Sequence, residues 1–411
     1  MTEPAQTGLH PDEKFRLGDL GGRLGLALPA GVVLLALAAL IGSFHDDNWR
    51  RFLHSYLLAV VYVTTFAVGA LFFVLIQHLT RARWSVVIRR VAEVLSSTFP
   101  VLFILVAAGV LIPILAGNHE LYAWTDPAVV KGDHLMESKT GWLNPVFFAI
   151  RICIYYAIWT FLARYFFRKS VEQDETGDPA VNDRLRVRSG PAIILFAFTT
   201  AGAGIDLLMT LAPKWYSTMF PVWFFAGSVV AIMALLALVP MALQRTGRLT
   251  HSVTVEHYHD VGKLLFGFLM FWAYISFSQF MLQWYGNLPE ETEFWDHRMF
   301  GEYGWLSWTL LLGHFAFPYL ILMSRETKRK KAALAAFAAW LLLMHAVDLY
   351  WLIIPQYGHK AITLKSVFMD ALAVGGAVLV FVGFAAREAR KVNLIPVRDP
   401  GLGESLRFEN F

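Results

Sequence analysis

Apolar residues occur along this chain in ten long runs, separated by short polar segments. A helix of about twenty residues, rising about 1.5 Å per residue, crosses the ~30 Å hydrocarbon core of a bilayer. Irregular backbone and sheet edges cannot satisfy their polar groups in lipid, so these runs predict helices. The predicted spans are residues 24–44, 53–77, 96–116, 143–165, 191–213, 218–242, 262–285, 305–324, 332–354 and 366–386.

The spans leave only loops and short tails outside the membrane. We therefore expect an all-α integral membrane protein of about ten transmembrane helices, with no separate globular domain. Its parts are an N-terminal tail at 1–23, a transmembrane domain at 24–386 and a C-terminal tail at 387–411. The N-terminal tail lacks the short apolar segment of a cleavable signal peptide, so the first span is expected to stay in the membrane.

A weak internal repeat suggests how the spans are grouped. The triplet Gly-Trp-Leu opens both the fourth span, at 141–143, and the eighth span, at 304–306. This spacing predicts two related four-helix bundles, made of spans 2–5 (about 53–213) and spans 6–9 (about 218–354), with spans 1 and 10 flanking them. Both copies would begin on the same side of the membrane, which makes the repeat parallel rather than inverted.

Composition and charge agree with a membrane protein. Hydrophobic residues make up 57% of the chain and charged residues 16%, both outside the range of soluble globular proteins. Of the 35 Lys and Arg residues, 26 fall in the tails and in the loops of one side, and eight fall in the loops of the other. The positive-inside rule then predicts that both termini are cytoplasmic. This distribution explains the net charge of +4 without a nucleic acid partner.

The single cysteine, Cys153, excludes an intramolecular disulfide and a cysteine-ligated cluster. It is expected to be a small buried hydrophobic residue of the fourth span. His314 and His345 lie at matching depths and could in principle clamp a haem. The bulky neighbours Met344 and Trp351 disfavour a flat porphyrin there, so we expect no metal and no cofactor bound by this chain.

Ionisable side chains inside the spans carry the candidate chemistry. A charge at the bilayer centre costs roughly 2.5–3.5 kcal/mol, so such a residue normally faces the bundle interior and has a partner. Placed by depth, three acids form a layer in the outer half of the membrane, with imidazoles beneath them. That layering predicts a proton half-channel open to the outer side, and the alternative is interhelical hydrogen bonds that hold the bundle together. The predicted proton path consists of Asp206, His314, His345, Asp348 and Asp370.

Two further groups of polar residues could line a quinone site or hold water. One comprises a cation and two tyrosines of the fourth span, and the other is a polar stripe at helical spacing in the seventh span. These residues are Arg151, Tyr155, Tyr156, Ser276, Gln279 and Gln283. Glu93 and Lys263 lie near the cytoplasmic face, where long side chains extend to the headgroups, and receive no role.

The outer loops at 117–142 and 286–305 are long and contain several aromatic and acidic residues. They are read either as an interfacial aromatic belt or as a docking surface with exposed aromatic residues. The candidate docking residues are His119, Glu120, Trp124, Glu290 and Trp295. The stretch at 171–190, by contrast, mixes both charge signs and is expected to be a solvated or partner-facing loop.

Three stretches carry a resemblance to a known family. They are HDVGKLLFGFLMFWAYISFSQFMLQWYGNLPEET (259–292), HELYAWTDP (119–127) and RDPGLGESLRFENF (398–411). The chain resembles the NrfD-like membrane subunits of bacterial alternative complex III over essentially its whole length. Its length and tail are similar to those of the smaller of the two such subunits.

The resemblance implies a fold of two four-helix bundles in the bacterial inner membrane. It also implies a role in a complex that oxidises menaquinol or ubiquinol and passes electrons to a cytochrome c or directly to a terminal oxidase. The expected partners are the larger NrfD-like paralogue, thought to hold the quinol, a periplasmic iron–sulfur protein and c-type cytochromes. The last two, rather than this chain, would carry the iron–sulfur clusters and haems. The smaller subunit is described as a second quinone-binding subunit, with a proposed role as a proton half-channel or structural partner.

Three functions therefore remain open from the sequence. The first is a non-catalytic subunit of a quinol-oxidising complex that supplies a periplasm-facing proton half-channel and a scaffold. The second is a subunit that binds quinol directly. The third is a stand-alone secondary transporter, although the inverted repeat and broken helices typical of transporters are not evident.

Overall fold

The computed structural model describes residues 9–45, 47–358 and 361–410. The described residues form helices and loops, with no β-strand and one isolated bridge between Lys14 and Arg248. Among them, ten helical segments are long and apolar enough to cross a membrane. This confirms the expected all-α fold of a multi-pass membrane protein.

Each predicted span corresponds to one helical segment, and several segments consist of consecutive helices. The ten segments are α1–α2 (Asp19–Gly25, Ala27–Gly42), α3 (Arg50–Leu79), α4–α5–η1–α6 (Val86–Ser96, Phe99–Val106, Ala107–Leu111, Ile112–Leu115), α9 (Pro145–Thr176), α10–η3 (Ala180–Leu207, Met209–Leu211), α11 (Phe220–Gln244), α12 (Val255–Gly286), α14–η4–α15 (Gly304–Thr309, Leu310–Ala316, Phe317–Leu322), α17–η5 (Lys331–Ile353, Ile354–Tyr357) and α18 (Leu364–Ala389). Shorter helices lie between them: η2 (Ala123–Thr125), α7 (Pro127–Val130), α8 (His134–Ser138), α13 (Pro289–Met299), α16 (Arg325–Arg329) and α19 (Leu402–Leu406).

The expectation of a solvated loop at 171–190 is wrong. Helix α9 continues to Thr176 and α10 begins at Ala180, so only three residues separate two long helices. Gly177 lies in the left-handed region, with φ 65°, and its amide donates to the Gln173 carbonyl as a helix C-cap. Polar residues extend both helices beyond the apolar runs because a helix in the headgroup region or in water can present a charged surface.

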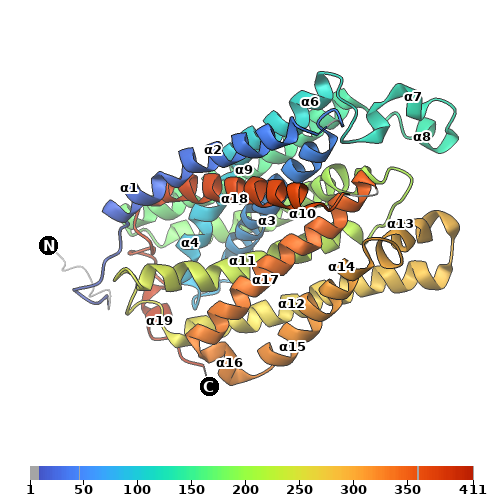
Figure 1. Ribbon diagram of the computed structural model, residues 1–411. Helices are drawn as coiled ribbons and strands as arrows, with labels where there is room; N and C mark the ends of the chain where they lie inside the picture. Colours follow the sequence, from blue (N-terminus) through green and yellow to red (C-terminus); the bar gives the residue numbers. More distant parts are fainter. Residues whose placement is uncertain (1–8, 46, 359–360, 411) are drawn as a thin grey trace.

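Helix α3 occupies the centre of the bundle (Figure 1), where it contacts α4, α10, α11, α17 and α18. Nearly all of its side chains are buried, whereas the first span packs mainly on α18 and leaves one side uncovered. Large apolar side chains are exposed around the bundle, among them Phe161, Phe198 and Phe277, each more than 60% exposed. A surface of this kind is expected to face lipid rather than water.

The N-terminal segment and the C-terminal tail meet at one end of the bundle, which we call the basic end (Figure 1). The Leu394 amide donates to the Phe15 carbonyl there, and Arg16 donates to the Asn393 side chain. Glu93 is fully buried at this end between Arg89 and Arg90, so it does not extend to the headgroups as expected. Its role is to hold two cations inside the fold, which the sequence pattern did not indicate.

Two of the spans contain a π-helical turn, η1 and η4, and each turn precedes a proline. Pro113 and Pro318 lack an amide hydrogen, and a proline ring inside a regular helix collides with the carbonyl four residues earlier. A π-turn widens the backbone at that point and relieves the collision. At η4 the Gly313 carbonyl, five residues before Pro318, accepts a hydrogen bond from the Trp340 indole instead. The same turn places His314 inside the bundle.

Candidate functional site

The candidate site lies in the middle of α17, where His345 and Asp348 face the bundle interior. Their exposed fractions are 1% and 2%. Asp348 Oδ2 accepts a hydrogen bond of 3.0 Å from the Trp272 indole of α12. Asp348 Oδ1 has no hydrogen-bond partner, and no ion pair to Asp348 occurs within the part of the chain that the structure describes. The carboxyl group is thus buried mid-membrane without a cation.

His345 is oriented by the central helix α3. Its Nε2 lies 2.9 Å from Thr65 Oγ1, and the Thr65 hydroxyl donates to the Tyr62 carbonyl at 2.6 Å. A hydroxyl has a single proton, so the imidazole must be the donor to Thr65. Nδ1 of His345 is therefore the unprotonated nitrogen, and it has no partner among the described residues. A buried basic nitrogen is thus left one helical turn from the carboxyl group of Asp348.

Gly227 of α11 makes room for this pair. A Cβ atom at position 227 would lie 2.9 Å from His345 Cε1, 3.1 Å from Nδ1 and 3.8 Å from Asp348 Oδ2. Helix α11 can therefore approach α17 closely only because the residue there is glycine. The backbone of α11 forms one wall of the site.

His314 reaches the same region from the π-helical turn η4. Its ring stacks on the Trp272 indole, with centroids 3.8 Å apart and an interplanar angle of 28°. Both ring nitrogens of His314 are buried and lack a hydrogen-bond partner in the described structure. Trp272 thus touches His314 with its face and Asp348 with its N–H. The structure brings two of the five predicted path residues, His314 and Asp348, against this one indole, and His345 lies one turn from Asp348 on α17.

Trp272 also lines an aromatic cavity of about 630 Å³. It is bounded by α11, α12, α13, α14, η4 and α17, and its lining is almost entirely aromatic and aliphatic, with Ser276 and Ser307 as polar exceptions. Phe300 and Trp308 belong to the lining and are 81% and 63% exposed, so the cavity communicates with the lipid-facing surface. Five tryptophans line it: Trp223, Trp272, Trp295, Trp308 and Trp351.

The donor set around this cavity does not fit a haem. A haem iron in a protein of this kind would need a histidine ring nitrogen as axial ligand, and no histidine is among the described residues that line this cavity. Within the described residues no group of three His, Cys, Asp or Glu side chains could hold a metal ion. The polar atoms that remain, an imidazole nitrogen and a carboxylate oxygen, suit the transfer of a proton or a hydrogen bond to an organic ligand.

Asp206, the fourth predicted path residue, lies in a separate cluster. Arg151 of α9 donates two hydrogen bonds of 2.8 Å to its carboxylate, and Tyr155 adds a third at 3.0 Å. Tyr155 can cross α10 because position 202 is glycine, where a Cβ atom would lie 2.5 Å from the phenol oxygen. Arg151 also donates to the Trp142 carbonyl and stacks on the Trp142 ring at 4.2 Å. Both charges are fully satisfied.

Asp370, the fifth, is paired in the same way at another place. Arg51, at the start of α3, donates to both carboxylate oxygens at 2.9 and 2.6 Å, and the Ser55 hydroxyl donates at 2.6 Å. Arg51 also donates to the Ala361 carbonyl. Arg51 precedes the predicted second span and would be placed in a loop by that boundary, yet it is only 1% exposed. Its position one turn before an apolar run was the signal that could have revealed the pair.

The other predicted lining residues are divided among different contacts. Tyr156 is hydrogen-bonded to Thr64 at 2.9 Å and is buried next to α3. Gln283 accepts from the indoles of Trp215 and Trp295 at 3.1 and 2.6 Å. Gln279 is 2% exposed, and neither of its amide atoms has a partner among the described residues. Of the predicted stripe, only Ser276 lines the aromatic cavity.

The expected exposed aromatic surface in the outer loops is wrong for both tryptophans. Trp124 is 3% exposed and packs between Tyr122 and Phe148, and Trp295 is 7% exposed against Trp223 and Trp351. Their size and amphipathic edge stabilise the loops themselves. Glu290 is exposed, and the partly buried His119 and Glu120 bond within the chain to Thr125 and Asn48.

Arg298 of α13 lies over the rings of Phe294 and Trp351, at the end of the bundle opposite the basic end. It is 1% exposed, donates to the carbonyls of Trp351 and Leu352, and lies 3.7 Å from the Phe294 ring centroid. Burial lowers the pKa of Arg298 to about 9. The cation is still present at neutral pH, where it complements the negative C-terminal end of α17.

Neither a known protein family nor a curated protein matches this chain.

Proposed function

We propose that this chain is a membrane subunit of a quinol-oxidising electron-transfer complex in the bacterial inner membrane, with both termini cytoplasmic. Its own contribution is to move protons between the membrane centre and the periplasmic side at the site formed by Asp348, His345 and His314. The complex would be alternative complex III or a close equivalent. Its iron–sulfur protein and c-type cytochromes would carry the redox centres, and a larger NrfD-like paralogue would be a further partner.

The observation that supports proton transfer most directly is the contrast among the buried acids of the spans. Glu93, Asp206 and Asp370 each accept bonds from a buried arginine, whereas Asp348 faces only uncharged tryptophan N–H groups, those of Trp272 and Trp223. A paired carboxylate is fixed in its ionised form by the cation, whereas a buried carboxyl group without a cation is free to carry a proton. The unprotonated Nδ1 of His345 supplies a second proton acceptor on the same helix face.

The assignment to a complex is tested by purifying the protein in mild detergent through a tag on its C-terminus. The reduced-minus-oxidised haem spectrum, the iron–sulfur EPR signal and the quinol:cytochrome c activity of the eluate are then recorded. We expect haem c, an iron–sulfur signal and quinol oxidation together. A colourless and inactive single polypeptide, from a preparation that keeps respiratory complexes intact, would refute the assignment and favour the transporter.

The role of the site is tested by Asp348→Asn in the intact complex. The amide keeps the Trp272 hydrogen bond and the side-chain volume but cannot exchange a proton. We expect normal assembly, with quinol turnover or proton release reduced by about tenfold or more, the usual scale for loss of a positioned acid–base group. Asp296→Asn is the matched control, because Asp296 is an exposed acid of α13. Unchanged turnover and proton stoichiometry in Asp348→Asn would leave the site with a structural role only.

Direct quinol binding is the second candidate, and the aromatic cavity favours it. A quinol head group is flat and amphipathic, and cavities of about 300–1,000 Å³ lined by aromatic residues with few polar groups are typical small-molecule sites. The cavity opens toward lipid, where quinols dissolve, and ends on Trp272. Ala273→Trp would fill it from α12 without touching Asp348. An increased KM for quinol with an unchanged proton stoichiometry would support this candidate, and unchanged kinetics would eliminate it.

A further inference from the structure

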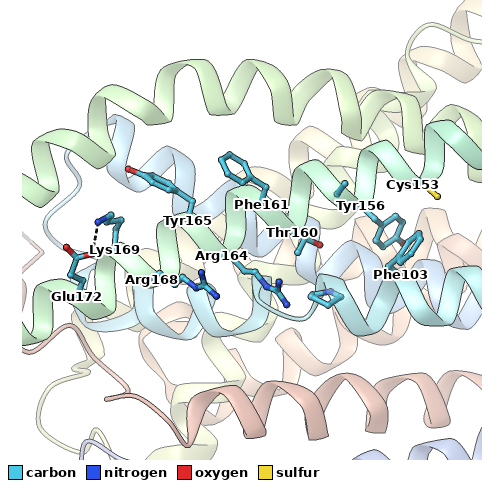
Figure 2. A pocket seen from close by; sticks show the side chains of 12 residues that line it. Phe103, Cys153, Tyr156, Thr160, Phe161, Arg164, Tyr165, Arg168, Lys169 and Glu172 are labelled. Carbon is cyan, nitrogen blue, oxygen red and sulfur yellow. Dashed lines mark hydrogen bonds and ion pairs between the residues drawn. The ribbon is translucent and has the colours of Figure 1, made fainter.

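A groove lies on the outer surface of the bundle, and it shares no lining residue with the aromatic cavity. This groove has a volume of about 760 Å³ and runs along α9, with Pro100 and Phe103 of α5 forming its other wall. Figure 2 shows its lining side chains, apolar near Phe103 and Cys153 and charged toward Glu172. Cys153 is exposed on this groove, so the expectation that it is buried is wrong.

The charged half of the groove contains two cations without counter-ions. Lys169 pairs with Glu172 at 2.6 Å, which leaves Arg164 and Arg168. Both arginines are exposed, and neither forms a hydrogen bond or an ion pair with any residue that the structure describes. They are four residues apart and point to the same side of α9 (Figure 2). Two like charges at this spacing repel each other, so an anion between them would be stabilising.

A neighbouring groove of about 430 Å³ shares the same two arginines. It lies between α9 and the end of α18, with Phe167 and Phe384 among its lining residues. Its acid and its lysine, Glu388 and Lys391, pair with each other at 2.6 Å. The two arginines therefore remain the uncompensated charges of both grooves.

The depth of the arginines matches the headgroup region of a bilayer. Helix α9 begins at Pro145, and Arg164 lies nineteen residues further along, which is about 29 Å at 1.5 Å per residue. The hydrocarbon core is about 30 Å thick, so both guanidinium groups reach the headgroups near the basic end. From Arg164 back to Cys153 the groove extends about 16 Å into the hydrocarbon, alongside Ala157 and Phe161.

We propose that this groove binds an anionic diacyl phospholipid, with the phosphate between Arg164 and Arg168 and an acyl chain along α9 against Phe103, Ala157 and Phe161. Guanidinium groups match the geometry of a phosphodiester and bind it through paired hydrogen bonds. The apolar half of the groove distinguishes a lipid from a free phosphate ion, which would gain nothing there. Basic pockets between transmembrane helices are a recurring form of lipid recognition.

The test measures lipid retention by the delipidated, detergent-solubilised protein. It is incubated with equimolar phosphatidylglycerol and phosphatidylcholine of identical acyl chains, and bound lipid is counted by native mass spectrometry. One basic residue near an anionic headgroup contributes a factor of about five in affinity. We therefore expect Arg164→Gln with Arg168→Gln to lower the preference for phosphatidylglycerol about 25-fold. Arg245→Gln with Arg325→Gln is the matched control, because both of these arginines are exposed, unpaired and outside the grooves.

Ala157→Trp provides a second variant that leaves every charge in place. It should fill the apolar half and lower the amount of phosphatidylglycerol bound, and excess inorganic phosphate should not displace the lipid from the unmodified protein. Equal retention of the two lipids by the unmodified protein would overturn the proposal. An unchanged preference for phosphatidylglycerol in the double arginine variant would also overturn it. If the double arginine variant bound lipid normally but lost a co-purifying polypeptide, the groove would be assigned to a protein partner instead.

Discussion

Asp206→Asn should be far more damaging to stability than Asp348→Asn, although both replace a buried transmembrane acid. The change at position 206 leaves the Arg151 side chain, which is 5% exposed, without an anion. Three hydrogen bonds to the carboxylate, two from Arg151 and one from Tyr155, lose their charge assistance. Removing one partner of a buried ion pair costs about 3–5 kcal/mol, because the remaining charge is buried unpaired. Asp348 has no cation to strand, so its replacement should cost less than about 1 kcal/mol.

The assay is reversible unfolding in mixed micelles with increasing sodium dodecyl sulfate, followed by tryptophan fluorescence. The free energy of unfolding is compared for the unmodified protein, Asp206→Asn, Asp206→Leu, Arg151→Met and the double variant Arg151→Met with Asp206→Leu. Replacing both partners of a buried pair by apolar residues is often nearly neutral, so the double variant should be more stable than either single variant. The resulting coupling energy should exceed about 2 kcal/mol, above the usual range for independent sites.

Two results would refute this reasoning. One is a loss below about 0.5 kcal/mol for Asp206→Asn, and the other is strictly additive effects in the double variant. If Asp206→Asn instead kept its stability but changed proton release by the intact complex, Asp206 would belong to the proton path after all. The comparison with Asp348→Asn thus separates a structural acid from a proton-transferring one.

Two further predictions concern a close approach of helices and the docking of the tail. Gly227→Ala should lower the free energy of unfolding by about 1–3 kcal/mol, because its Cβ atom would press on His345. Gly190→Ala is the control: its Cβ atom would lie in open space on α10, so this variant should not be destabilised. Thermal melting compares the two variants. Burial raises the pKa of Asp399, but Arg89 and further hydrogen bonds outweigh it and hold this pKa below 3.8. The ion pair between Arg89 and Asp399 should therefore keep the C-terminal tail docked at neutral pH and release it only as the pH falls below about 3.8. Asp399→Asn should release the tail already at pH 7, and amide hydrogen exchange of residues 398–407 measures this. Equal exchange in that variant and the unmodified protein would contradict the prediction.

The outcome for the predicted proton path shows which properties are local and which are not. Depth along a helix follows from counting residues, and all five predicted residues proved to be buried. Which of them face each other depends on helix rotation and on the order of helices in the bundle. Asp206 and Asp370 point toward arginines of α9 and α3, and His314 reaches Trp272 through a π-turn. Whether the group as a whole conducts protons stays a prediction.

The sequence by itself determined the membrane fold and its ten spans, because the length of an apolar run and the bilayer thickness set that result independently of any contact. It also singled out His345 and Asp348, because burying ionisable groups in hydrocarbon is costly wherever the helix lies. Only the tertiary structure decided that Asp348 lacks a cation, that Arg51 is a buried partner of Asp370, and that an aromatic cavity ends on Trp272. Ion pairs and cavities form between residues tens to hundreds of positions apart, so they depend on packing that no local pattern specifies.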